Sequence, residues 1–383
     1  MENLTHSLVG ATLAELALPN GASREQRRAF FVTGVLAANL PDADLVYTWI
    51  TPAPLGSLLH HRGHTHTLGG LVALALLFGV AAMLPSVQRT IAPMRGRWWL
   101  LVAVGLVSHL VLDSWNSYGV HPFWPFDARW IYGDAIFIAD PWLWLLLGIS
   151  AALNTQRRGG GATLGIMLGL IVAVATWRGV IPPAGAVALC AGAIAFVAMA
   201  RRWMPRRRAA VATTIAALYV MAMFGARERV KSSVLADRAT DARGRVVDLV
   251  LSPEPANPLC WSVLSIVADE SRNQYETTRG TASVIGTGGC GPRDTRQAWE
   301  TPVAQSLGAL RDLNARDCWV RAWLQFGRAP EMAPGVIYDR RYGGATGNFS
   351  SMAVGDAAAR SGCPAHLTSW RPPRADLLTA GAE

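Results

Sequence analysis

Lysine is nearly absent from this 383-residue chain, in which Lys231 is the only one. The formal net charge of +9 is therefore carried almost entirely by arginine. Exclusive use of arginine indicates a compositional bias of the genome, and the arginines concentrate in short loops between apolar segments. We therefore do not interpret the positive charge as a nucleic-acid-binding surface, and we expect no nucleic-acid partner.

Charged residues of both signs are also scarce. They make up 16% of the chain, against roughly 25% in typical soluble proteins, while 51% of residues are hydrophobic and the mean hydropathy is +0.24. These values exclude an ordinary soluble protein and favour a membrane protein with a sizeable water-soluble part. No basic segment precedes the first apolar stretch, so we expect no cleavable signal peptide and expect Met1 to be retained.

Apolar segments recur through residues 1–225. Six of them are close to the roughly 20 residues that a helix needs to cross a bilayer. Two earlier segments, 4–18 and 29–40, are shorter and carry polar residues. We predict an α-helical polytopic membrane domain of six to eight helices over residues 1–225. The six clearer segments are 68–84, 98–112, 136–153, 162–177, 184–200 and 209–225.

Arginines are distributed unevenly between the loops that join these segments. Ten of them lie in three loops, and the alternate loops 114–135 and 178–183 hold one each. The positive-inside rule places the arginine-rich loops in the cytoplasm, so the intervening loops and everything after residue 225 are predicted to face outward. The arginine-rich loops are 85–97, 154–161 and 201–208.

Residues 226–383 have shorter apolar runs and more proline, glycine and aspartate. Segments 245–251, 261–268 and 274–278 alternate as β-strands do, and 298–311 is predicted to be a helix. We therefore predict a C-terminal, extracytoplasmic soluble domain of the α+β or β-rich type over residues 226–383.

Four of the five cysteines lie in this C-terminal domain. An even number in a segment predicted to face outward favours one or two disulfides, with free thiols as the alternative. A four-cysteine zinc site is less favoured because no two cysteines have C-x-x-C spacing. The sequence leaves three pairings open for Cys260, Cys290, Cys318 and Cys363.

Half of the eight histidines fall within seven consecutive residues, as His60, His61, His64 and His66. Imidazole is the commonest metal ligand and titrates near neutral pH, so the cluster indicates metal binding, proton transfer or both. Their spacing does not allow all four to reach one ion. We expect two or three ligands from this segment, without specifying which.

Other residues of the same ligand types lie at the ends of apolar segments. They are His6, the pair Asp42 and Asp44, and the pair His109 and Asp113. His109 and Asp113 are four residues apart, so they project from one helical face and can share an ion. Ionisable groups are costly within apolar segments, which favours a functional role.

Imidazoles and carboxylates without a thiolate are typical of zinc, with manganese or iron as alternatives. We predict one or two divalent ions, which would activate water. Asp44, His61 and His66 are predicted to be catalytic, and Arg62 is available to bind a phosphate. The predicted metal ligands are His6, Asp42, His64, His109 and Asp113. Four residues of the aromatic-rich segment 113–142 are predicted as further ligands or as partners of ligands, namely Asn116, His121, Asp134 and Asp140.

Several of these motifs together resemble a bacterial family of inner-membrane, metal-dependent hydrolases called YdjM-like, which is described as LexA-regulated or LexA-binding. The matching stretches are Thr5-His6, residues 39–44 (NLPDAD), residues 61–67 (HRGHTHT), His109-xxx-Asp113, residues 116–126, Gly133-Asp134 and residues 140–142. The resemblance is specific over residues 1–145, and it implies a multi-pass protein of the bacterial inner membrane. Regulation by LexA is a simpler interpretation than contact with LexA, since the site is predicted to face outward.

The order of these ligands is also similar to that of zinc-dependent phospholipase C and S1/P1 nucleases. The resemblance implies a membrane-bound hydrolase that cleaves a phosphoester, such as that of a lipid or an envelope precursor, at the outer leaflet of the bilayer. The alternative is a non-catalytic membrane module with a structural metal and a partner-binding tail. An ion transporter is disfavoured because the ionisable residues gather at one face. The oligomeric state is left open.

Overall fold

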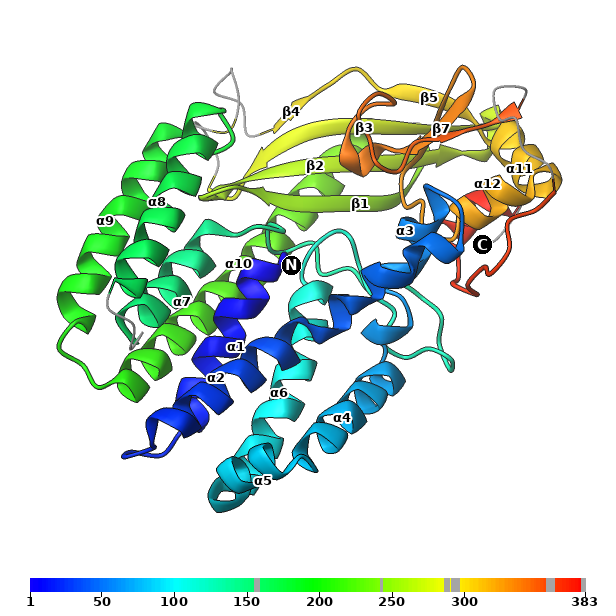
Figure 1. The fold of residues 1–383 in the computed structure, drawn as a ribbon. Coiled ribbons are helices and arrows are strands. Elements are labelled where there is room, and N and C mark those ends of the chain that lie inside the picture. The colour runs from blue at the N-terminus through cyan, green and yellow to red at the C-terminus, as the bar shows by residue number, and fades with distance from the viewer. Residues whose placement is uncertain (155–158, 242–243, 286–289, 291–296, 356–361, 380–383) are drawn as a thin grey trace.

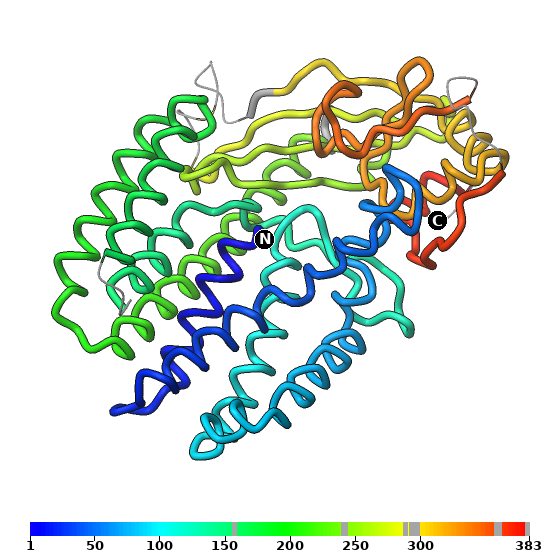
Figure 2. The backbone as a smooth tube through the Cα atoms, in the orientation of Figure 1, coloured from blue at the N-terminus to red at the C-terminus, as the bar shows by residue number. Residues whose placement is uncertain are grey.

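A helical bundle forms one part of the computed structural model, and two antiparallel sheets with short helices cover one end of that bundle (Figure 1). The N-terminus lies where the bundle meets the sheets, and the C-terminus lies within the sheet part (Figure 2). The structure describes residues 1–154, 159–241, 244–285, 290, 297–355 and 362–379.

All eight predicted apolar segments are helical, which confirms the predicted fold class. Shorter α-helices and 3₁₀ turns connect them. The helices of this part are α1 (Asn3–Ala17), α2 (Arg24–Asn39), η1 (Leu40–Ile50), α3 (Leu55–His60), η2 (His64–His66), α4 (Leu68–Ala82), α5 (Pro85–Ile91), η3 (Ala92–Met94), α6 (Arg95–Ser114), α7 (Pro141–Asn154), α8 (Gly160–Trp177), α9 (Pro183–Ala200) and α10 (Pro205–Asp241).

Five helical segments in the described part of the chain are long and apolar enough to cross a bilayer. A sixth is obtained if the pair Leu55–His66 and Leu68–Ala82, which is bent by 67°, counts as one span. The other five are Arg24–Ile50, Pro85–Ser114, Gly160–Trp177, Pro183–Ala200 and Pro205–Arg238. The lower limit of the predicted six to eight is thus reached only with the bent pair.

Several helix boundaries differ from those predicted, and those of α7 and α10 affect the interpretation. Helix α7 begins at Pro141 instead of residue 136, because the Asp140 carboxylate accepts hydrogen bonds from the amides of Trp142 and Leu143 and so caps the first turn. Helix α10 continues past residue 225 to Asp241. The predicted domain boundary at residues 225 and 226 therefore falls within one helix.

Helices α1, α2 and α6 approach closely because small residues line their contacts. A Cβ atom on Gly34 of α2 would lie 2.3 Å from the carbonyl oxygen of Gly10 on α1, and the reverse contact has the same distance. A Cβ atom on Gly105 of α6 would lie 2.8 Å from the Cβ of Ala37. Such stripes of small residues let helix backbones meet inside membranes.

The C-terminal part consists of one five-stranded and one three-stranded sheet, both antiparallel. Strand β3 pairs with β2, β4 and β5, and β7 lies between β6 and β8. The elements are β1 (Arg245–Glu254), β2 (Asn257–Asp269), η4 (Glu270–Arg272), β3 (Gln274–Ser283), β4 (Gln297–Trp299), β5 (Val303–Ser306), α11 (Leu307–Arg316), α12 (Cys318–Trp323), β6 (Pro330–Ala333), β7 (Val336–Asp339), η5 (Arg340–Tyr342), β8 (Met352–Ala353) and α13 (Ala375–Leu378).

The three predicted strands are confirmed, whereas the predicted helix over residues 298–311 is wrong for most of its length. This segment contains strands β4 and β5, and α11 begins only at Leu307. Pro302 favours an extended backbone at the residue before it. The Ser306 hydroxyl then accepts a hydrogen bond from the Ala309 amide and starts the helix there.

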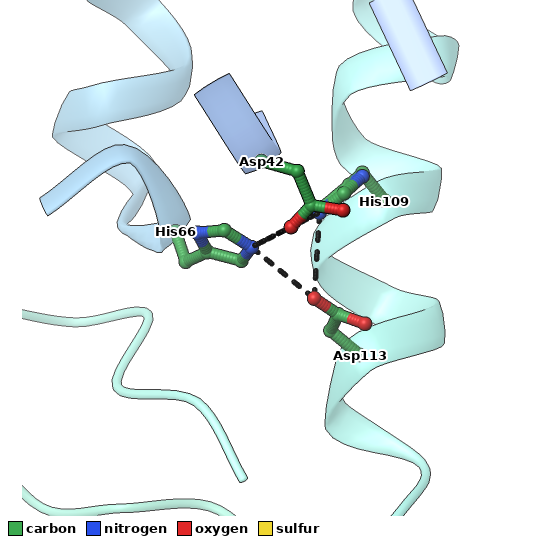
Figure 3. A group of neighbouring side chains, drawn as sticks. All are labelled: Asp42, His66, His109 and Asp113. Atoms are coloured by element: carbon green, nitrogen blue, oxygen red, sulfur yellow. Dashed lines mark hydrogen bonds and ion pairs between the residues drawn. The ribbon is translucent and has the colours of Figure 1, made fainter. Parts of the chain in front are cut away.

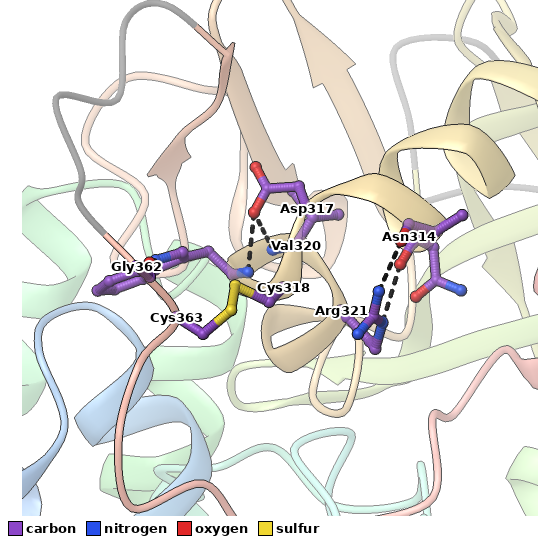
Figure 4. The surroundings of a disulfide bond; sticks show 9 residues. Asn314, Asp317, Cys318, Val320, Arg321, Gly362 and Cys363 are labelled. Atoms are coloured by element: carbon purple, nitrogen blue, oxygen red, sulfur yellow. Dashed lines mark hydrogen bonds between the residues drawn. A yellow bond between two sulfur atoms is a disulfide. The ribbon is translucent and has the colours of Figure 1, made fainter.

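Two disulfides, Cys260–Cys290 and Cys318–Cys363, cross-link the C-terminal part, which confirms the disulfide prediction. The second joins the start of α12 to the segment that begins at Gly362 (Figure 4). Asp317 accepts hydrogen bonds from the amides of Trp319 and Val320 beside this bond and so caps α12.

The sheet part is firmly attached to the bundle. Leu55, Leu58 and Leu59 of α3 are fully buried in the same core as Trp323 and Trp370 of the C-terminal part. This contact holds α3 against the sheets, so the segment that follows α3 has a fixed starting point.

A buried ion pair adds a second attachment. The Arg328 guanidinium donates to both oxygens of Asp134 at 2.7–2.8 Å and to those of Asp248 at 2.7 and 3.1 Å. Burial alone would raise the pKa of Asp248, but Arg328 beside it lowers that pKa to about 2. Arg328 thereby connects the segment before α7 with strand β1.

The described arginine-rich loops lie at the end of the bundle away from the sheets. Figure 1 shows α5 and the connection α9–α10 at that end. Arg157 and Arg158 of the loop 154–161 fall outside the described residues.

Replacing Gly34 with alanine should destabilise the bundle, because the added Cβ would meet a backbone oxygen that cannot move alone. We expect a cost of about 1–3 kcal/mol, measured as a lower midpoint of thermal unfolding in detergent. Gly169→Ala is the matched control, since nothing lies within 4 Å of its Cβ position. Alanine there should be neutral or slightly stabilising. Equal midpoints for the two variants would contradict the close approach.

Candidate metal centre

Four buried side chains from three separate segments converge at the end of the bundle nearest the sheets. Asp42 lies in η1, His66 ends η2, and His109 and Asp113 lie one turn apart on α6 (Figure 3). Asp42 is 8% exposed and the other three are fully buried. They form one of two groups in the described chain that could hold a metal ion.

The donor atoms of this cluster have the separations that a metal site requires. His66 Nε2 lies 3.0 Å from His109 Nε2 and 3.2 Å from Asp113 Oδ2. Asp42 Oδ1 lies 3.4 Å from His66 Nε2 and 3.5 Å from His109 Nε2. Ligands of a tetrahedral zinc, at about 2.0–2.1 Å from the ion, lie about 3.3 Å apart. The four residues therefore fit one such ion.

Hydrogen bonds on the far ring nitrogens orient both histidines. His109 Nδ1 lies 2.7 Å from the Ala38 carbonyl oxygen, and His66 Nδ1 lies 3.2 Å from Asp44 Oδ2. An acceptor at Nδ1 favours the tautomer that leaves Nε2 free to bind metal. The two Nε2 atoms face each other inside the cluster, as ligands of a shared ion would.

A second group shares Asp42 with the first and adds Asp44 and His61. Asp44 is fully buried. Its carboxylate accepts hydrogen bonds from the Arg62 amide and the Thr65 hydroxyl, both at 2.9 Å, and so fixes the conformation of the histidine segment. His61 Nδ1 lies 3.1 Å from Asp44, and its side chain is 23% exposed. The two groups together could hold two ions, which is the predicted upper number.

The second oxygen of Asp113 faces a different set of groups. His6 Nε2 lies 3.3 Å from Asp113 Oδ1, and its ring stacks on His109 with a centroid separation of 3.8 Å. Arg62 donates to the same oxygen at 3.0 Å, and the amino group of Met1 also contacts it. His6 Nδ1 has no hydrogen-bond partner among the described residues. His6 thus lies beside the cluster, with its Nε2 directed at the Asp113 carboxylate.

A tight turn after α3 brings the histidine segment to this place. Arg62 adopts a left-handed backbone conformation with φ of 57°, and a Cβ atom on Gly63 would lie 2.5 Å from the His60 carbonyl oxygen. The Arg62 side chain is buried, with its guanidinium on Asn116 and over the ring of Tyr118. Arg62 therefore positions Asp113 instead of facing solvent.

Two of the four clustered histidines do not join the metal groups. His64, which was predicted as a ligand, packs against the rings of Trp124 and Trp370. The turn η2 is a 3₁₀ helix with three residues per turn, so side chains two residues apart point in different directions. His60 Nε2 lies 2.8 Å from the Thr51 hydroxyl. His66, which was predicted as catalytic, occupies a ligand position.

The additional candidates of segment 113–142 have other partners. Asn116 binds Arg62, and Asp134 and Asp140 have the structural contacts described above. His121 packs between Trp130 and Trp370, and burial lowers its pKa to about 3. Of these four residues, only Asn116 therefore acts on a candidate ligand, because it binds Arg62 and Arg62 contacts Asp113. The residue that sequence reasoning missed is Thr65, whose hydroxyl bonds to Asp44, and threonine between two histidines carries no signal for this role.

Comparisons with known proteins agree with the predicted membrane family. The model of the family described as YdjM inner membrane protein matches residues 1–181. The inner membrane protein YbcI of Escherichia coli strain K12 is 33% identical over 109 residues, which cover 28% of this chain and 57% of that protein. The uncharacterized protein YfhP of Bacillus subtilis strain 168 is 25% identical over 150 residues, which cover 38% and 43%.

The chain thus spans about half the length of the curated relatives it matches. No solved structure matches it. The descriptions of the family and of these relatives name no metal, substrate or reaction, so hydrolysis and the likeness to phospholipase C stay predictions. Residues 1–181, which carry all four members of the Asp42, His66, His109 and Asp113 cluster, match the model of the YdjM inner membrane protein family.

Proposed function

We propose that this protein is a membrane-bound, metal-dependent phosphoesterase whose substrate is a lipid or lipid-linked precursor. The observation that carries the proposal is the convergence of Asp42, His66, His109 and Asp113, whose donor atoms fit one divalent ion. The absence of thiolates and the two imidazoles favour zinc, with manganese or iron as alternatives.

Each residue near the cluster has a chemical task in this proposal. A bound ion would supply a Lewis acid that polarises a phosphoryl oxygen and lowers the pKa of water. The His61 side chain is 23% exposed and Asp44 orients it, so His61 is suited to transfer protons. Arg62 holds Asp113 in place through Oδ1 and leaves Oδ2 for the ion.

The site and the C-terminal domain face outward in this proposal. The described arginine-rich loops lie at the opposite end of the bundle from the sheets, and the positive-inside rule assigns that end to the cytoplasm (Figure 1). Two disulfides in the C-terminal part favour an oxidising compartment.

A second candidate function is a structural metal site in a non-catalytic membrane module. The observation in its favour is burial, since three of the four cluster residues have no exposed surface. Such a site would stabilise the fold and would hydrolyse nothing. Metal content, stability and activity of the same variants separate the two functions.

Purified protein, prepared without chelator, should contain one or two equivalents of a transition metal by inductively coupled plasma mass spectrometry. His109→Ala and Asp113→Ala should retain less than about 0.1 equivalent, because each removes a ligand from a buried site. His64→Ala is the matched control, since His64 lies among tryptophans, and it should keep the wild-type content. A wild-type protein without stoichiometric metal would contradict the proposal.

His61→Ala should lower kcat/KM for a lipid phosphodiester in mixed micelles by about 10²-fold, the usual contribution of one proton-transfer group. The protein should keep the metal held by the four-residue cluster and its unfolding midpoint. His60→Ala serves as the control, because His60 contacts Thr51 away from the cluster. Metal-loaded, folded wild-type protein that hydrolyses no phosphoester would favour the structural-metal alternative.

Alkaline phosphatase fused after Glu383 should be active in cells, because the enzyme folds only outside the cytoplasm and the C-terminal domain is proposed to lie there. A fusion after Arg202, in the arginine-rich loop between α9 and α10, should be inactive at equal expression. The reverse pattern of activities would place the site in the cytoplasm.

A further inference from the structure

A second feature lies within the bundle beside the metal cluster. An apolar groove with a cavity volume of about 160 Å³ lies between α1, α6, α7 and α10. Its walls include Val9 of α1, Leu112 of α6, Leu143 of α7 and Val220 of α10. Two of these helices, α6 and α10, belong to segments that are long and apolar enough to cross a bilayer.

The groove presents hydrocarbon almost exclusively, although three hydroxyl residues line it. Thr12 donates to the Leu8 carbonyl oxygen at 2.8 Å, and Ser108 donates to that of Gly105 at the same distance. Thr213 donates to the Ala209 carbonyl oxygen at 2.9 Å. Each hydroxyl proton is therefore used within its own helix. An apolar cavity of about 150 Å³ stays dry and binds hydrocarbons.

The groove opens on the outer surface of the helical bundle. Val111 is 41% exposed and Ala217 is also exposed at its rim, whereas Leu143 and Leu112 at its base are buried. Both α6 and α10 pack against α1, so the opening lies between helices of the membrane part. A molecule can enter it sideways from the bilayer.

Residues of the groove and of the metal centre lie close together along α1 and α6. On α1, Val9 and Leu13 follow His6 at three and seven residues, so all three share one helical face. Val9 lies only about 5 Å from His6 along the helix axis. On α6, Ser108 and Leu112 of the groove are the sequence neighbours of His109 and Asp113. On α1 the groove thus lies about one turn from His6, whose ring stacks on His109 of the cluster.

We propose that this groove binds one hydrocarbon chain of a membrane phospholipid, with the phosphate-bearing headgroup directed toward the Asp42, His66, His109 and Asp113 cluster. The direction of the headgroup rests on the proposed phosphoesterase function, whereas the binding of the chain does not. The groove thereby selects a substrate that is anchored in the bilayer.

Photocrosslinking in vesicles tests chain binding without reference to activity. The full-length protein is reconstituted in phosphatidylethanolamine and phosphatidylglycerol with trace phosphatidylglycerol that carries a diazirine in one acyl chain. Labelled peptides are then mapped by mass spectrometry. Helix α8 has no buried residue, so its labelling measures general lipid contact. Labelling at 108–112 and 213–220 should exceed that of α8.

Ala216→Phe fills the groove and should lower labelling at 108–112 by at least about fivefold relative to α8. Ala222→Phe is the matched control, because Ala222 lies on the exposed surface of α10 outside the groove, and it should change nothing. If Ala216→Phe does not fold, Ala217→Phe at the rim replaces it. The proposal would be overturned if the groove of the wild-type protein were labelled no more than α8. It would also be overturned if labelling of the groove persisted in the phenylalanine variant.

Activity separates this inference from the function on which its second half rests. Ala216→Phe should lower the ratio of phosphatidylglycerol hydrolysis to bis(p-nitrophenyl) phosphate hydrolysis at least about tenfold, because the chromogenic ester has no chain to bind. An unchanged ratio would overturn the headgroup direction. Groove labelling in a wild type that hydrolyses neither compound would contradict the phosphoesterase function and support chain binding alone.

Discussion

The close packing of α1, α2 and α6 is the constraint on which the candidate site depends. Gly10, Gly34 and Gly105 leave no room for a side chain where these helices meet. His6 lies one turn before Gly10, and His109 lies one turn after Gly105. Because the backbones meet there, η1, which follows α2, brings Asp42 to within 3.5 Å of His109. A wider bundle would separate ligands that come from different helices.

The C-terminal domain contributes to the same site although it supplies none of the four ligands. Its core buries α3, whose last residue begins the turn that carries His61 and His66. Trp370 of this domain donates to the Leu59 carbonyl oxygen at 2.8 Å and packs against His64. Arg328 binds Asp134 of the bundle from the other side. The domain therefore acts as a rigid support that fixes one wall of the metal centre.

Much of this arrangement could be predicted from local sequence patterns. Apolar runs identified the eight longer helices of the described bundle but not the short α3 and α5. The spacing of His109 and Asp113 predicted a shared helical face, which their 3.3 Å contact confirms. The distribution of roles within 60–66 could not be predicted, because the backbone there changes from a left-handed residue to a 3₁₀ turn. The partners of Asp134 and Asp140 were equally inaccessible, since both depend on residues far along the chain.

The burial of the metal ligands and the position of the groove together determine which substrates can reach the cluster. The sheet domain covers the end of the bundle where the ligands lie, and His66, His109 and Asp113 have no exposed surface. A water-soluble phosphoester would have to pass this cover. The apolar groove instead opens between membrane helices and ends about one turn from His6. A lipid that enters from the bilayer would therefore meet the metal site without displacing the domain, which is why the proposed substrate is a membrane phospholipid.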